Sequence, residues 1–412
     1  MATLTATAMS GISKINGKLA ASASAWTWFD VAWTLVIVII FITVGVSIAK
    51  TFEKPYNVRT KVEACMAAAP PIATGRKSLR DYKVKLRNEL KIADNLWIVG
   101  NFYVATVNTA GLLYPAADGV FSPEAISYAA KQGARGFVFD IWPDATLKVV
   151  ESGSNWRRIS MNSLSFNTAF QSMIESVFAK GLNPVGTDAA EDYVVCYLRF
   201  RGTPVKATFD SVAGTLRSNM EQYRMDASFN ACNGQKRIVT TNIRELASRV
   251  IIVSNTRAEK SALTDYINMA PEENYIVEET LSNIAGLDGT ALDNEHKKIN
   301  RSLTFIAPKA ESESPNYNWQ RWGLDRGICC FAMDFMSLDE AYKAKFGTYS
   351  YYINLEEKED EEGFANPGDK TRKKNLRKPI QFIEPTQTIE NPKFNKGKLD
   401  VSADTRLDAL LG

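Results

Sequence analysis

The sequence is poor in histidine and in cysteine motifs. Among its 412 residues the only histidine is His296, which lies in a polar run of Asn, Glu and Lys, so any mechanism that needs two histidines is excluded. The five cysteines are odd in number and include no Cys-x-x-Cys pair. This usage favours reduced cysteines in a reducing compartment over a disulfide framework.

The chain also lacks an excess of charge of one sign. It has 49 Lys and Arg against 46 Asp and Glu, a net charge of +3, whereas nucleic-acid binding requires a concentrated basic face. A basic block at Arg372–Lys378 follows an acidic block at Glu356–Glu362, which largely cancels it. No P-loop, G-x-S-x-G, H-E-x-x-H or G-x-G-x-x-G motif occurs. We therefore expect no nucleic-acid partner.

One long apolar run is present. Residues Val31 to Ala49 contain no charge, and a helix of this length covers about 28 Å, the hydrocarbon thickness of a bilayer. Trp28 and Trp33 stand at one end, where indole rings favour the headgroup layer. A cleaved signal peptide and a buried core helix are the alternatives. The run predicts a transmembrane helix at 31–49, with a lipid bilayer as partner.

The basic residues around this run predict its orientation. Four of them follow it closely between Lys50 and Lys61, whereas only Lys14 and Lys18 precede it. The positive-inside tendency then places the large C-terminal part on the cytoplasmic side of a single-pass membrane protein.

Composition divides the rest of the chain. Residues 1–30 form a polar arm, residues 50–94 a connector, and residues 355–412 a charged tail that we expect to be extended. Residues 95–354 alternate short apolar runs with amphipathic ones, and 256–300 are a polar insertion within them.

This alternation predicts an α/β fold. The candidate strands are 96–106, 136–141, 192–200, 249–254, 303–307 and 327–335, and the candidate helices are 77–91, 123–132, 165–180, 211–223 and 338–346. Strands that alternate with helices indicate a parallel sheet or barrel, and about 260 residues is a usual size for a (β/α)8 TIM barrel.

Several segments in order resemble the catalytic domain of phosphatidylinositol-specific phospholipase C. Phe102–Thr109 and Gln132–Trp142 resemble its first two strands, and Val149–Ser154 resembles its third strand end. Asn183-Pro184 before 192–199 and Gly327–Asp334 before Phe346–Tyr349 continue the order. The resemblance implies a TIM barrel, two catalytic histidines and a calcium shell of carboxylates and amides.

The positions that match this chemistry are mostly replaced. Val107 and Ser154 stand where the resemblance implies histidines, and Val138 and Arg199 stand where it implies glutamates. Of the implied metal ligands only Asn108 and Asp140 are retained. Two ligands are too few for a calcium ion, which takes six to eight oxygens. We expect no cofactor, no metal and no catalytic residue, hence a pseudoenzyme. Arg199 is expected to pair with Asp140 and close the site, or else to stand in for the metal.

These features together favour a non-catalytic structural protein. A membrane anchor, a degenerate barrel and two polar tails look similar to an inner minor capsid component of a large icosahedral DNA virus with an internal membrane. The resemblance implies a virion location between inner membrane and capsid shell. Its partners would be other capsid or membrane-assembly proteins, contacted through the arm and tail. A lipid-headgroup-binding module and a residual phosphoinositide phosphodiesterase remain as alternatives.

Overall fold

The computed structural model describes most of the middle of the chain. The described residues are 28–72, 74–113, 119–152, 157–178, 191–232, 234–271, 276–279, 303–306, 319–320 and 328–353. The predicted tail 355–412, most of the predicted arm, Ser154 and His296 lie outside them. The chain divides into two units, residues 1–61 and 62–412, and each is described by itself.

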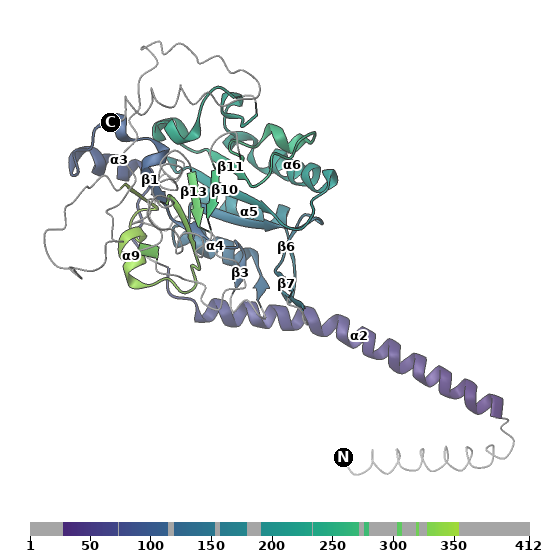
Figure 1. The fold of residues 1–412 in the computed structure, drawn as a ribbon. Helices are drawn as coiled ribbons and strands as arrows, with labels where there is room; N and C mark the ends of the chain where they lie inside the picture. The colour runs from purple at the N-terminus through teal and green to yellow at the C-terminus, as the bar shows by residue number, and fades with distance from the viewer. Residues whose placement is uncertain are drawn as a thin grey trace, which may run out of the picture. The chain divides into compact units, whose positions relative to one another are not determined.

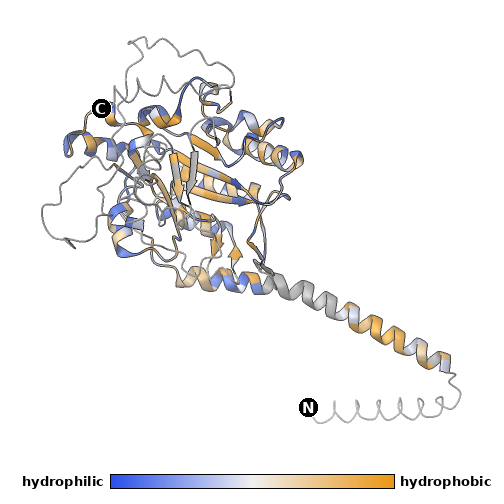
Figure 2. Cartoon of the chain, in the orientation of Figure 1, coloured by the Kyte–Doolittle hydropathy of each residue, from blue (hydrophilic) through white to orange (hydrophobic). Residues whose placement is uncertain are grey.

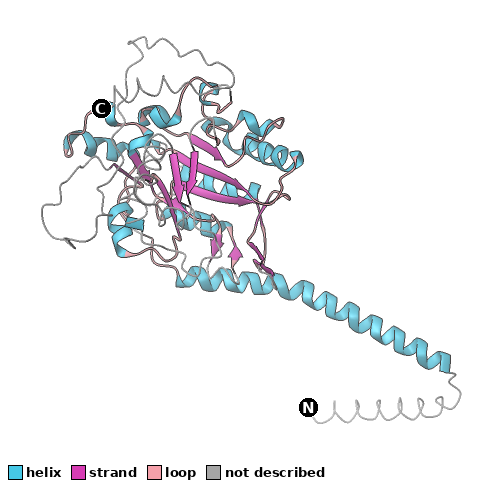
Figure 3. Ribbon diagram, in the orientation of Figure 1, coloured by secondary structure: helices cyan, strands magenta, loops and turns pink. Residues whose placement is uncertain are grey.

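The first unit contains most of one long helix, α2 (Trp28–Ala68, 41 residues) (Figure 3). The predicted apolar segment 31–49 is helical, but the helix does not end with it. It continues to Ala68, shortly before the consecutive prolines Pro70 and Pro71, which disfavour a further helical turn. The first residues of the predicted connector 50–94 thus belong to the same helix as the apolar segment.

The apolar side chains in the first part of α2 are exposed. Leu35, Ile39 and Phe41 are 57%, 53% and 74% exposed, and Figure 2 shows this part of α2 in the hydrophobic colour. The side chains of residues 46–49 are outside the description. Within the ranges given above, no helix combines the length and the apolar character that a membrane crossing requires. The predicted membrane span is thus not confirmed, although its helical conformation is.

A parallel sheet forms the centre of the second unit (Figure 1). Its strand order is β11-β10-β5-β2-β14-β13-β12, and every neighbouring pair in that order is parallel. The strands are β2 (Thr106–Val107), β5 (Gly136–Ile141), β10 (Val194–Phe200), β11 (Val250–Ser254), β12 (Ile276–Glu279), β13 (Leu303–Ile306) and β14 (Cys330–Met333).

The predicted closed (β/α)8 barrel is not formed by these residues. β11 and β12 stand at the two ends of the sheet, and no pairing joins them in the described ranges. Within the segment that resembles a third strand end, β7 (Val150–Ser152) forms an antiparallel ribbon with β8 (Arg157–Ile159), and β5 pairs directly with β10. The predicted insertion 256–300 is not merely polar loop, because it supplies β12 to the sheet. In the part of the chain that the structure describes, the fold is α/β with an open sheet.

The predicted strand 96–106 is broken into shorter pieces. Two turns of 3-10 helix (Asp94–Leu96 and Val99–Asn101) precede β1 (Phe102–Val104), which pairs antiparallel with β15 (Tyr351–Ile353). The chain changes partner at Ala105, whose carbonyl accepts hydrogen bonds from the two residues that start β5. β2 then joins the parallel sheet.

The helices of the second unit follow the predicted ones closely. They are α3 (Leu79–Asn88), α4 (Pro123–Lys131), α5 (Phe166–Phe178), α6 (Lys206–Met220) and α9 (Glu340–Phe346). The short strands β6 (Thr146–Leu147) and β9 (Leu164–Ser165) extend the sheet by antiparallel pairing from β5, and β3 (Leu112–Leu113) and β4 (Val120–Phe121) form a separate antiparallel pair. Ser122 caps α4 and Pro123 occupies its first turn, as the sequence indicates. α4 packs on α5 and α5 on α6.

Both faces of the sheet are buried, each in its own apolar cluster. Phe137, Phe139 and Ile141 of β5 belong to the cluster that includes α4, α5 and α6. Val138 points to the opposite face, where Tyr197 of β10 shares its cluster. A parallel sheet covered on both faces explains why its strands read as continuous apolar runs. No disulfide joins any of the five cysteines, as expected.

Gly136 allows the close approach of β5 to β2. A Cβ atom added there would lie 2.8 Å from the Cβ of Thr106, its partner in register. We expect Gly136→Ala to lower the free energy of unfolding by about 1–3 kcal/mol, because the strands must separate. Gly214→Ala in α6 is the matched control: its added Cβ meets nothing within 4 Å, so stability should rise by about 0.5–1 kcal/mol. Urea unfolding of both variants checks this, and an unchanged Gly136→Ala protein would contradict it.

Candidate functional site

An ion pair joins the carboxyl ends of β5 and β10. Arg199 and Asp140 are directly adjacent in the parallel register. The Arg199 Nε donates to Asp140 Oδ1 at 2.6 Å and its Nη2 donates to Oδ2 at 2.8 Å. Arg199 is 1% exposed and Asp140 5%. The pairing expected from the sequence is therefore present, in the bidentate geometry that arginine favours.

Two further side chains complete this cluster, and sequence reasoning missed both. Arg201 Nε donates to Asp140 Oδ1 at 2.6 Å from a side chain that is 31% exposed. Thr109 Oγ1 donates to Asp140 Oδ2 at 3.1 Å. Thr109 has a φ of 42°, a left-handed conformation that few non-glycine residues adopt. Its place at the end of the matched segment Phe102–Thr109 was the one available signal in the sequence.

The electrostatics of the cluster keep Asp140 ionised. Burial by itself raises the pKa of this carboxyl, but the two arginines lower the pKa by a larger amount. Their charges and hydrogen bonds lower the pKa of Asp140 from 3.8 to about 2. At neutral pH the group is a carboxylate with both oxygens engaged, which leaves it unsuited to accept a proton from a substrate.

Two of the replaced positions, Val107 and Val138, are buried in different apolar clusters. Val107 is the last residue of β2 and pairs in register with Met333 and Phe137. Val138 lies within the buried apolar cluster of the other sheet face. Ser154, the other replaced histidine position, lies outside the described residues.

The remnant of the implied calcium shell is small. Asn108 is buried directly after β2, and its backbone N–H donates to Met333 O at 2.9 Å. Asp140 is held by the arginines. In the part of the chain that the structure describes, no three His, Cys, Asp or Glu side chains come together as a metal site would require. Asn108 and Asp140 alone do not fit a calcium ion.

A second buried carboxyl lies beside these positions. Asp334 follows β14, the neighbour of β2, and is 4% exposed. Its Oδ2 accepts from Ser337 Oγ at 2.6 Å and its Oδ1 from the Met336 N–H at 3.0 Å. Burial raises the pKa of Asp334 above its ordinary value. The sequence shows this aspartate at a strand end but gave no reason to expect its burial.

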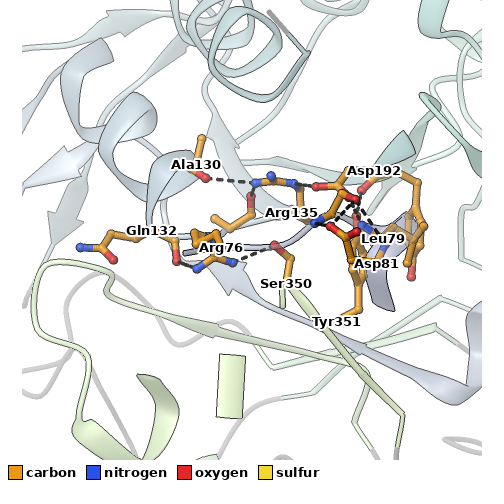
Figure 4. Close-up of polar contacts among 12 residues, drawn as sticks. Arg76, Leu79, Asp81, Ala130, Gln132, Arg135, Asp192, Ser350 and Tyr351 are labelled. Carbon is orange, nitrogen blue, oxygen red and sulfur yellow. Dashed lines mark hydrogen bonds and ion pairs between the residues drawn. The ribbon is translucent and has the colours of Figure 1, made fainter. Parts of the chain in front are cut away.

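Another polar cluster lies at the opposite, amino end of the same strands (Figure 4). Arg135 Nε pairs with Asp192 Oδ2 at 2.7 Å, and Asp192 Oδ1 accepts the Leu79 N–H at the start of α3 at 2.7 Å. Arg76 Nη2 donates to Ser350 Oγ at 2.9 Å, and its Nη1 donates to the Gln132 carbonyl. Burial lowers the pKa of Arg76 to about 9. These contacts fasten α3 and β15 to the sheet.

Comparison with known proteins supplies solved structures only, since no family model and no curated protein matches the sequence. PLC21 from L. pealei is 15% identical over 63% of this chain and 38% of its own, with a TM-score of 0.46. PLC21 from S. officinalis is 14% identical over 63% of this chain and 37% of its own, with a TM-score of 0.47. This chain thus spans a minor part of either protein.

A bacterial structure is similar over most of its own length. The calcium-dependent phosphoinositol-specific phospholipase C of Pseudomonas sp is 9% identical, over 64% of this chain and 97% of its own, with a TM-score of 0.37. The likeness to these phospholipase C structures concerns the α/β fold and extends no further.

Proposed function

We propose that the protein is a non-catalytic, membrane-attached structural component. The observation that carries this proposal is the cluster at the carboxyl ends of β5 and β10. There the carboxylate of Asp140 is occupied by Arg199, Arg201 and Thr109. A carboxylate held in this way positions strands and offers no open site for chemistry.

The chemistry of a cyclising phosphodiesterase supports the same conclusion. That reaction needs a base for the attacking hydroxyl and an acid for the leaving oxygen, with pKa values near the working pH. Asp140 has a pKa of about 2, and a valine stands at position 107, where the first base is implied. The one histidine of the chain cannot supply two such groups.

The membrane attachment is supported by the exposed apolar stretch of α2. Side chains from Leu35 to Ile42 are all more than 40% exposed, so α2 offers an apolar surface on successive sides of the helix. Exposed apolar area on this scale favours transfer into lipid. In this proposal the segment 31–49 anchors the chain in the bilayer and the larger C-terminal part faces the cytoplasm.

The assembly role extends the proposal one step. We assign the protein to the space between an internal membrane and the protein shell of a virion, as a minor capsid component. The polar arm 1–30 and the charged tail 355–412 would contact neighbouring proteins. The composition of these two segments supports the assignment, because neither has enough apolar surface to build a core of its own.

A phosphodiesterase assay tests the non-catalytic part. Purified full-length protein should release no cyclic inositol phosphate from phosphatidylinositol vesicles above the blank, with calcium or with a chelator. A known active phospholipase C serves as the positive control. Release that disappears in an Asp140→Asn variant would overturn the proposal.

One observation favours a second candidate, a site for an anionic lipid headgroup. Two guanidinium groups face one carboxylate, so the cluster carries an excess positive charge, and Arg201 is partly open to solvent. Titration calorimetry with inositol phosphates separates the candidates. A heat of binding that the unmodified protein shows and the Arg201→Gln variant lacks supports headgroup binding. The structural proposal predicts no heat of binding for either protein.

A further inference from the structure

Two lysines of the second unit face a tyrosine next to the point where the described chain ends. Lys77 Nζ lies 5.9 Å from the ring centre of Tyr349, and Lys85 Nζ lies 5.3 Å from it. The same ring packs on Tyr82 of α3 at 4.8 Å between ring centres. Both ammonium groups therefore lie within 6 Å of the centre of one ring, which packs on α3.

Two carboxylates near these lysines are engaged elsewhere, and a third, Glu89 at the end of α3, is exposed. Asp81 accepts hydrogen bonds from the N–H and hydroxyl of Ser78 at the start of α3. Glu191 pairs with Lys83 at 3.1 Å. Within the described ranges no carboxylate pairs with Lys77 or Lys85, so the surface beside Tyr349 is positively charged.

The end of β15 brings the following segment to this surface. The Ile353 N–H donates to the Tyr82 hydroxyl at 3.0 Å, and Lys77 N–H donates to the Thr348 carbonyl at 2.9 Å. Three residues after Ile353 the sequence enters Glu356–Glu362, seven residues of which six are acidic. Three residues span at most roughly 11 Å, so the start of this run lies within reach of α3.

We infer that the acidic run Glu356–Glu362 docks on its own chain, against Lys77 and Lys85 of the α3 surface. Opposite charges placed this close attract most strongly at low ionic strength, and the short connection makes the contact effectively intramolecular. The inference does not depend on the proposed function.

Distance measurement between two spin labels tests the contact in the full-length chain. The labels sit at Asn88→Cys, the exposed last residue of α3, and at Lys358→Cys, the one non-acidic residue of the run, after Cys65 and Cys232 are replaced by serine. A narrow distance distribution is expected at low salt. It should broaden several-fold in 1 M salt, where the screening length falls to about 3 Å.

Charge variants make the result specific. Lys77→Gln with Lys85→Gln should broaden the distribution as salt does, and Glu356→Gln with Glu357→Gln should do the same from the other side. Lys206→Gln with Lys260→Gln removes two exposed lysines elsewhere and should leave it narrow. A thermal melt confirms that each variant folds. A broad distribution in the unmodified pair at low salt, or a narrow one that Lys77→Gln with Lys85→Gln leaves unchanged, would overturn the inference.

Discussion

Replacing Asp140 with asparagine should lower the free energy of unfolding by about 3–5 kcal/mol. The carboxylate is the counter-charge of Arg199, which is 1% exposed and cannot turn to solvent. Removing one partner of a buried ion pair leaves the other charge desolvated without compensation. Urea unfolding of the two proteins at pH 7 measures the difference.

Two controls separate the buried pair from ordinary surface charge. Asp144→Asn breaks the ion pair with Lys148, in which the Asp144 side chain is 52% exposed, and should cost less than about 1 kcal/mol. Asp140→Leu combined with Arg199→Met should recover most of the stability lost in Asp140→Asn, because an apolar pair removes both charges. If Asp140→Asn lowered the free energy of unfolding by less than about 1 kcal/mol, the ion pair would not be what stabilises the contact between β5 and β10.

The pH dependence of the same comparison has a fixed sign. The folded pKa of Asp140, about 2, lies below the ordinary value of 3.8 that applies to the unfolded chain. The stabilisation is therefore complete above about pH 4 and is lost as the pH falls toward 2. The shift corresponds to about 2 kcal/mol. The gap between the unmodified protein and Asp140→Asn should narrow by that amount between pH 4 and pH 2. A gap that stays constant over this range would contradict the assignment.

Full-length protein should remain with the membrane pellet after alkaline carbonate extraction, and a fourfold substitution in α2 should abolish this. The substitutions are Leu35→Ser, Ile37→Ser, Ile39→Ser and Phe41→Ser. Each buried side chain of this kind contributes about 1.5–3 kcal/mol on transfer from water. Loss of four should weaken partitioning into vesicles by at least about a thousandfold.

The control for this experiment removes exposed apolar side chains that are not part of the stretch. Val84 and Leu90, at and just after α3, are 54% and 48% exposed. Val84→Ser with Leu90→Ser should leave vesicle partitioning unchanged. Release of the unmodified protein by carbonate would contradict the proposed membrane anchor. If the α2 variant partitioned as strongly as the unmodified protein, another surface would be responsible for membrane binding.

The sequence alone determined the elements whose signals are local. β5 was predicted with its observed bounds, and β10 and β11 to within two residues, because apolar runs between polar boundaries indicate buried strands. α4 was predicted from its serine cap and first-turn proline. The Arg199–Asp140 pair followed from two matched strand ends, since parallel neighbours bring their carboxyl ends together.

Only the tertiary structure decided the features that depend on distant segments. An α/β alternation is the same for an open sheet and a closed barrel, and the difference lies in whether β11 meets β12. The polar composition of 256–300 concealed β12, whose pairing with β13 supplies its hydrogen bonds. Thr109 and Arg201 reach Asp140 through a left-handed turn and a loop after β10. Local patterns record burial and backbone preference, whereas strand closure and the convergence of side chains are set by packing between residues far apart in the chain.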